Sequence, residues 1–188
     1  MKPDDLSRVG SNSWVTYLSG KNADYPEAAL RADLARIRQR VIGMREDTTT
    51  PDTRLSDDPM KFNPCSIDSL LHLACGGIPV PLGSALHVRL RYFDTQQGRP
   101  GLPADVAALV DRLTDDEARV TLVNVHQTET RAVVVQSGAY GEHQIDSLAT
   151  NGVSQQVNDR RVTVKLGPGC GGMLVLKTKR FQNIPRFD

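Results

Sequence analysis

The densest group of side chains that could do chemistry lies between Gly138 and Gln144. Tyr140 offers a ring face, and Glu142, His143 and Gln144 offer a carboxylate, an imidazole and an amide. A pyranose presents apolar C–H faces to a ring and hydroxyls to such polar groups, so the segment is a candidate sugar-binding loop. Glu142 and His143 are equally a candidate acid/base pair. A β-bulge, favoured by the glycines of the segment, explains the same residues without a ligand.

Carboxylates suited to a metal ion gather in one proline-bounded loop. Asp52, Asp57 and Asp58 supply the hard oxygen ligands that Ca²⁺ prefers. Their spacing matches no EF-hand loop, and a solvated surface loop accounts for them as well. We therefore expect no metal at this loop.

Cysteine and glycine patterns indicate neither a zinc site nor a nucleotide site. Cys65, Cys75 and Cys170 lack a C-x-x-C spacing, although a disulfide between the first two is allowed. The glycine-rich run Gly167–Gly172 precedes a predicted strand, so it lacks the helix N-terminus of a phosphate loop. We expect no cofactor.

A short basic stripe is predicted where the pattern changes from helical to extended. His87, Arg89 and Arg91 alternate with apolar residues on one expected strand, and Arg99 lies nearby. The stripe is a candidate interface for an acidic partner surface. The polar outer face of a sheet produces the same alternation.

One long amphipathic helix is predicted from Asp24 to Glu46. Leu34, Ile37 and Val41 belong to an apolar stripe with spacings of three and four. A single helix of this kind is stabilised mainly by tertiary packing, so the stripe is expected to dock on the chain itself or on a partner. We treat these three residues as candidate interface residues.

Helix-start signals support two N-terminal helices. Asp24 and Glu27 have the D-x-x-E spacing of a capping box. A second, short helix is expected at Ser66–Ala74, with Ser66 as N-cap and the following glycines ending it. This short helix is expected to bury four apolar residues: Ile67, Leu70, Leu71 and Leu73.

The C-terminal half is predicted to be almost wholly β. A first strand contains the alternating residues of Leu86–Tyr92, a short helix is expected at Pro103–Leu113, and Asn151-Gly152 predicts a type I′ hairpin. The remaining strands are expected at Arg119–His126, Arg131–Ser137, Glu142–Ala149, Val153–Val157, Arg161–Leu166 and Gly172–Phe181.

This order predicts a mainly β fold, an antiparallel immunoglobulin-like sandwich of about seven strands preceded by an N-terminal helical segment. We assign residues 1–84 to the helical segment with an extended connector, and residues 85–188 to the sandwich domain.

Composition restricts the partners. Charges nearly cancel, with 23 Lys and Arg against 22 Asp and Glu, so neither nucleic acid nor an anionic membrane is an expected partner. No segment approaches the ~20 apolar residues of a membrane helix, and the first residues lack the apolar run of a signal peptide. A cytoplasmic location is the expectation for the chain as written.

Two segments resemble a known accessory domain. VTLVNVHQTETRAVVVQ (Val120–Gln136) and VTVKLGPGCGGMLVL (Val162–Leu176) are similar to the closing β-sandwich behind the catalytic domains of many bacterial glycoside hydrolases. The resemblance covers about half of the chain and implies a sandwich fold. It supports the fold more than the function.

A second resemblance involves the segments YPEAALRADLARIRQRV, TTTPDTRLSDDPMKFNP and LRYFDTQQGRPGLPADVAALVDRLTDD. They are similar to the tail of large bacterial proteins, some of which carry an α-barrel domain akin to linalool dehydratase/isomerase. That barrel has no counterpart in this sequence, so the resemblance implies an accessory tail or a separate subunit.

Three functions are compatible with these features. The first is a non-catalytic accessory domain or subunit that packs on a partner enzyme or forms a homo-oligomer. The second is a carbohydrate-binding module, although sugar platforms usually display several rings and Trp14 is the single tryptophan. The third is a small lyase or isomerase that uses Glu142 and His143.

Overall fold

The computed structural model describes residues 11–50, 63–65, 67–79 and 84–186. Three helices come first: α1 (Ser11–Leu18), α2 (Tyr25–Glu46) and α3 (Asp68–Leu70), which continues as the π-helical turn η3 (Leu71–Cys75). The strands follow as β1 (Leu90–Asp94), β2 (Arg99–Pro100), β3 (Val106–Leu113), β4 (Glu117–Asn124), β5 (Arg131–Ser137), β6 (Gln144–Thr150), β7 (Val153–Asp159), β8 (Arg161–Leu166) and β9 (Gly171–Lys179).

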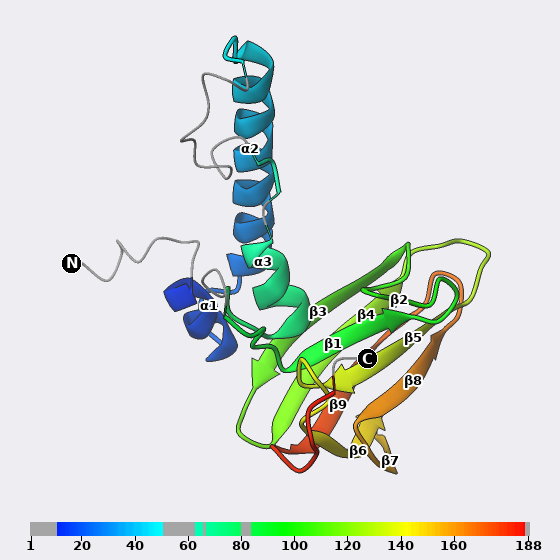
Figure 1. Cartoon of the computed structure of the whole chain (residues 1–188). Coiled ribbons are helices and arrows are strands. Elements are labelled where there is room, and N and C mark those ends of the chain that lie inside the picture. The colour runs from blue at the N-terminus through cyan, green and yellow to red at the C-terminus, as the bar shows by residue number, and fades with distance from the viewer. Residues whose placement is uncertain (1–10, 51–62, 66, 80–83, 187–188) are drawn as a thin grey trace.

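The strands described above form two sheets packed face to face (Figure 1). One has the order β2-β1-β5-β8 and the other the order β3-β4-β9-β6-β7, and every pairing is antiparallel. The predicted fold class, a mainly β, immunoglobulin-like sandwich preceded by helices, is confirmed. The described chain has nine strands instead of about seven, because β2 and β3 were not predicted.

The core lies between the sheets and is built by alternation along the strands. In β4 and β5 every second residue is buried, because successive side chains of a strand point to opposite faces. Val120 and Leu122 of β4 therefore face Val133 and Val135 of β5, and all four are fully buried. The aromatic content is low, and branched aliphatic side chains fill most of this core.

The predicted helix at Pro103–Leu113 is wrong, because β3 occupies most of this range. Val106 and Val110 point into the sandwich core, whereas Leu109 and Leu113 contact the helical cluster on the other side. A register shift between Val110 and Arg112 changes the alternation within the strand. A strand covered on both faces is apolar on both, and its residues imitate the spacing of a helix.

The hairpin signal at Asn151-Gly152 is confirmed. Both residues have positive φ, 49° and 80°, as a type I′ turn requires, and the turn joins β6 to β7. The turn at Gly167-Pro168-Gly169 lies between β8 and β9, where Gly169 has a φ of 61°.

Helix α2 occupies the predicted range but stands away from the sandwich over most of its length (Figure 1). Its buried residues are Tyr25, Ala29 and Asp33, and Leu34 is 52% exposed. Of the two docking surfaces expected for Leu34, the described chain itself is therefore excluded, and docking on a partner stays a prediction. The face of α2 toward the chain carries Tyr25, Ala29 and Asp33, and near Ala29 the helix approaches α3 closely: Ser69 Oγ lies 3.4 Å from the Ala29 carbonyl oxygen.

The predicted capping box at the start of α2 is also wrong. Asp24 makes no side-chain cap, and Glu27 Oε1 instead accepts from Arg31 Nη2 at 2.6 Å, one turn later. Pro26 in the first turn makes a cap less necessary, since it has no N–H to satisfy.

The second helix runs from Asp68 to Cys75, and it buries Leu73 as predicted but not the whole predicted face. Ile67 and Leu70 are exposed, and the buried residues are Ser69, His72 and Leu73. Gly76, with a φ of 57°, ends the helix as predicted. Ser66 lies outside the described residues.

A cluster of rings attaches the helices to one another and to β3. Trp14 stacks on His72 with 4.7 Å between ring centroids, and the Tyr25 hydroxyl lies 2.7 Å from His72 Nδ1. Burial lowers the pKa of His72 and raises that of Tyr25 to about 12. The burial of this cluster therefore favours the neutral form of the His72 imidazole.

None of the helices that the structure describes is long and apolar enough to span a membrane.

The neutral state of His72 predicts pH-dependent stability. A buried histidine with a lowered pKa binds its proton more weakly than the unfolded chain does, so stability is lost as the pH falls through about 6.5 and below. His72→Asn keeps an acceptor for Tyr25 but removes the titrating group. We expect its melting temperature to change less between pH 7.5 and pH 5.5 than that of the wild type.

The control is His87→Asn, since the His87 side chain is exposed and packs no ring cluster. It should retain the wild-type pH dependence, as measured by thermal denaturation monitored by circular dichroism. A wild-type pH dependence in His72→Asn would contradict the assignment.

Candidate functional site

The loop between β5 and β6 folds back on itself around the Glu142 carboxylate. Glu142 Oε2 accepts a hydrogen bond of 2.8 Å from the Tyr140 N–H. A Cβ at Gly138 would lie 2.4 Å from this carboxylate, and Gly138 has a φ of 84°. The loop therefore requires a glycine here for both space and backbone conformation.

His143 is buried beside this carboxylate and is held by the C-terminal segment. Its Nδ1 accepts from the Phe181 N–H at 3.1 Å, so in the neutral ring Nε2 carries the proton. Nε2 lies 3.9 Å from Glu142 Oε1. Burial lowers the pKa of His143, Glu142 opposes this, and Arg89 and Arg180 add to it. The pair is a neutral imidazole beside a partly exposed carboxylate.

The segment after β9 is fastened across the same loop. Asn183 donates from its backbone to the Glu142 carbonyl at 3.1 Å and from its side chain to the His143 carbonyl at 3.0 Å. The Arg186 N–H donates to the Tyr140 carbonyl at 2.8 Å. On the other side, the Tyr140 phenol oxygen accepts from the Leu86 N–H at 3.1 Å.

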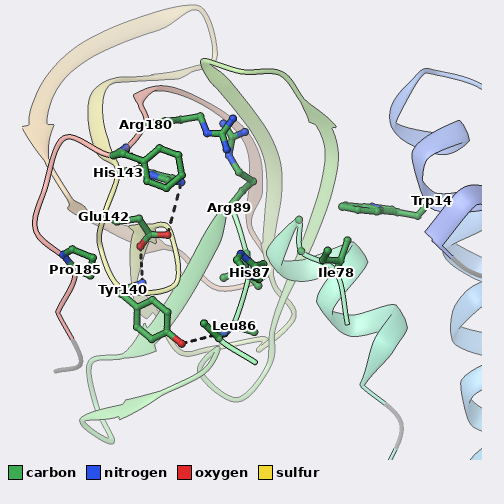
Figure 2. A pocket seen from close by; sticks show the side chains of 15 residues that line it. Trp14, Ile78, Leu86, His87, Arg89, Tyr140, Glu142, His143, Arg180 and Pro185 are labelled. Carbon is green, nitrogen blue, oxygen red and sulfur yellow. Dashed lines mark hydrogen bonds and ion pairs between the residues drawn. The ribbon is translucent and has the colours of Figure 1, made fainter. Parts of the chain in front are cut away.

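These segments enclose a cavity of about 410 Å³ (Figure 2). Its polar side chains come from three segments that are distant in sequence: the approach to β1, the β5–β6 loop and the residues after β9. Trp14 of α1 lines the cavity from the helical side. The polar lining residues are His87, Arg89, Tyr140, Glu142, His143 and Arg180.

The predicted ligand-binding cluster is largely brought together. Tyr140, Glu142 and His143 line the cavity, whereas Gln144 does not and donates to Asp146 Oδ1 at 3.2 Å. The roles of these residues remain predictions. Arg180 and Phe181 were missed, because they follow the last strand and no local pattern connects them to a loop almost forty residues earlier.

The predicted basic stripe is divided by the structure. His87 and Arg89 precede β1 and line the cavity, but Arg91 lies within β1 and is outside it. Arg91 donates to the Ala139 carbonyl at 2.8 Å and lies over the Phe93 ring. Arg89 donates to the Thr114 carbonyl at 2.8 Å. These arginines hold loops together, so they do not form one continuous basic surface.

The weak metal prediction at Asp52, Asp57 and Asp58 lies outside the described residues. Within the described residues, no group of three or more potential metal-binding side chains is found. The three cysteines are free thiols, and burial raises the pKa of Cys75 to about 11.

The apolar stripe of α2 forms a second candidate surface. Leu30, Leu34 and Met44 are 41%, 52% and 47% exposed, and Ile37 and Val41 are half-buried. At the sandwich end of the helix lies an apolar groove of about 500 Å³ between the helices and strands β3 and β4. It is lined by residues that include Pro26, Leu30, Leu70, Leu73, Leu102 and Val106.

Comparisons with known proteins match parts of the chain. Residues 7–71, roughly a third of the sequence, match a domain of unknown function, DUF8034. No curated protein matches the chain. Among solved structures, the chain is similar to parts of two glycosidase-class proteins. A proposed α-galactosidase from Bacteroides fragilis NCTC 9343 has 16% identity and a TM-score of 0.34, covering 44% of this chain and 19% of that one.

The other is a proposed α-N-acetylgalactosaminidase from Bacillus halodurans C-125, with 19% identity and a TM-score of 0.35. It covers 50% of this chain and 21% of that chain. The chain thus spans about a fifth of the length of the solved structures it matches.

Gly138→Ala tests the geometry of the loop. The alanine must adopt a left-handed conformation, which costs about 1–2 kcal/mol, and its methyl group must displace the Glu142 carboxylate from Tyr140. Gly152→Ala is a matched control, because its φ of 80° is similar but its Cβ would meet no atom within 4 Å. We expect Gly138→Ala to lower the free energy of unfolding by about 1 kcal/mol more than Gly152→Ala does.

Denaturant unfolding measures both variants. When Glu142 is also replaced by alanine, Gly138→Ala should lower the free energy of unfolding by less than it does in the wild-type background, because the obstructing carboxylate is gone. Equal losses for the two single variants would mean that Glu142 is not packed against Gly138.

Proposed function

We propose that this chain is a non-catalytic accessory domain that binds an amphipathic helix of a partner protein along α2. The observation that carries the proposal is the exposed apolar stripe of α2. A helix of 22 residues gains most of its stability from packing, yet three residues of this stripe are exposed and the other two are only half-buried. A surface of this kind is typical of an interaction site.

The stripe has the spacing of a coiled-coil seam. Leu34 and Val41 are seven residues apart and correspond to positions a of a heptad. The positions d are then occupied by Leu30, Ile37 and Met44. The apolar groove continues the seam, because Leu30 belongs to both. A partner helix can therefore bury more than the two heptads of α2.

Charge beside the seam indicates which partner fits. Arg31, Arg38 and Arg45 follow the seam at intervals of seven residues, and their side chains are exposed, although Arg31 also forms an ion pair with Glu27. Positions of this kind select partners through charge. A helix with acidic residues beside its apolar seam matches this row best.

A second copy of the chain fits less well. Antiparallel packing would set the two arginine rows against each other, which is destabilising. In parallel packing, the arginine row of each copy would lie against Asp33 and Arg40 of the other copy. Asp33 is buried, and Arg40 already donates to the carbonyls of Asn63 and Cys65 at 2.9 and 3.0 Å.

The geometry of Glu142 and His143 supports a non-catalytic role. One carboxylate oxygen and one ring nitrogen are used by backbone N–H groups, and their free atoms are 3.9 Å apart. These interactions fasten the C-terminal segment to the loop, so the two residues have a structural role that requires no catalysis.

A charge-matched pair of peptides tests the proposal. Both are helical peptides of three heptads with Leu and Ile at the seam, one with Glu and the other with Lys beside it. We expect the Glu peptide to bind at least about tenfold more tightly than the Lys peptide, and its binding to weaken with salt. Isothermal titration calorimetry at two salt concentrations measures both effects.

Leu34→Asp/Val41→Asp should abolish binding of the Glu peptide, because it places carboxylates in the seam. Leu34 is largely exposed and Val41 is half-buried, so we expect the β-sheet circular dichroism to be retained and the melting temperature to fall only slightly. Gln39→Asp, on an exposed position outside the stripe, is the control and should bind normally. Equal binding of the two peptides, or a stable dimer of the chain alone that Leu34→Asp dissociates, would overturn the acidic-helix proposal.

A further inference from the structure

The cavity beside the β5–β6 loop has an exposed ring held in an unfavourable backbone conformation. Phe181 has a φ of 56°, which is rare for a bulky residue, and it is 67% exposed. Its N–H donates to His143, and the rings of the two residues are perpendicular with 4.8 Å between centroids. A strained backbone conformation that burial of the side chain does not compensate often marks a functional site.

Two guanidinium groups lie at the same end of the cavity. Arg89 and Arg180 both line it, and Figure 2 shows both side chains on the far side of His143 from Glu142. Arg180 lies over the Phe181 ring at 5.1 Å, and its ion pair with the exposed Asp115 is loose at 3.9 Å. Arg89 donates from its two terminal nitrogens to the Thr114 and Asp115 carbonyls, and its Nε is buried with no hydrogen-bond partner among the described residues. This end of the cavity is therefore suited to a carboxylate.

The other end of the cavity has a hydrogen-bond acceptor and a hydrogen-bond donor, spaced so that one hydroxyl group can bind both. Glu142 Oε1 and His143 Nε2 are 3.9 Å apart, too far for a direct hydrogen bond. An oxygen between them would lie about 2.8 Å from each, accepting from Nε2–H and donating to the carboxylate. Figure 2 places these two groups between Tyr140 and the arginines.

We infer that this cavity binds a monosaccharide that carries a carboxylate, a uronic acid. The C–H face of the sugar packs on the Phe181 ring, a hydroxyl bridges Glu142 and His143, and the carboxylate meets Arg89 and Arg180. The volume of about 410 Å³ is within the range of small-ligand sites. This site is distinct from the seam of α2, and it does not depend on the proposed partner helix.

The single tryptophan provides a direct readout, because Trp14 lines the cavity. Trp14 fluorescence and calorimetry would follow titrations of the full chain with D-glucuronate, D-glucose and hexanoate. We expect saturable binding of glucuronate, with glucose and hexanoate each at least about tenfold weaker. Glucose lacks the carboxylate and hexanoate lacks the hydroxyls.

Two variants assign the contacts. Arg180→Gln should weaken glucuronate at least about tenfold and leave glucose unchanged, whereas Phe181→Ala should weaken both sugars. Thermal denaturation verifies that each variant is folded, and Arg180→Lys, which keeps the charge, replaces Arg180→Gln if that variant is unstable.

Three results would overturn the inference. The first is the absence of saturable glucuronate binding in both measurements. The second is glucose binding as tightly as glucuronate, which would make the arginines irrelevant to recognition. The third is hexanoate binding as tightly as glucuronate, which would assign the cavity to apolar acids.

Discussion

The contact of β3 with two apolar clusters, one on each face, is the constraint on which the arrangement of the molecule depends. Val110 points into the sandwich core and is fully buried, whereas Leu109 and Leu113 contact the ring cluster of the helices. One strand therefore belongs to two cores and fixes the helices relative to the sandwich. The wall of the cavity at Trp14 and the groove at Leu30 both exist because this strand positions the elements beside it.

Helix α2 distributes its residues in an unusual way. The face that packs on the chain carries Ala29 and Asp33. Because the Ala29 side chain is small, the helix can approach α3 closely there, and the Ser69 hydroxyl meets the Ala29 carbonyl. The apolar side chains of the stripe lie next to this face, so the contact with α3 does not bury them. Burial of apolar surface is the main favourable term in association, so the fold retains on α2 a source of binding energy that folding does not use.

The polar groups that line the cavity are held in place by hydrogen bonds and still offer atoms that a ligand can bind. Its loop and its C-terminal segment are joined by hydrogen bonds that involve Tyr140, Glu142, His143 and Asn183, so the groups are held before any ligand arrives. Preorganised polar groups lose less entropy on binding than mobile ones do. The buried imidazole is neutral and acts as a support for Phe181, while the arginines give the site its positive charge.

The sequence by itself determined the sandwich, the long helix and the loop of Tyr140, Glu142 and His143, because alternation, helical spacing and turn residues are local signals. Asn151-Gly152 and the ends of β5 and β8 are examples in which the local signal was sufficient. The sequence could not distinguish β3 from a helix, because its apolar residues serve two cores. It also could not show which face of α2 is buried. Only the tertiary structure brought Arg89, Arg180 and Phe181 to the loop, since side chains distant in sequence become neighbours through the pairing of strands, which no local pattern encodes.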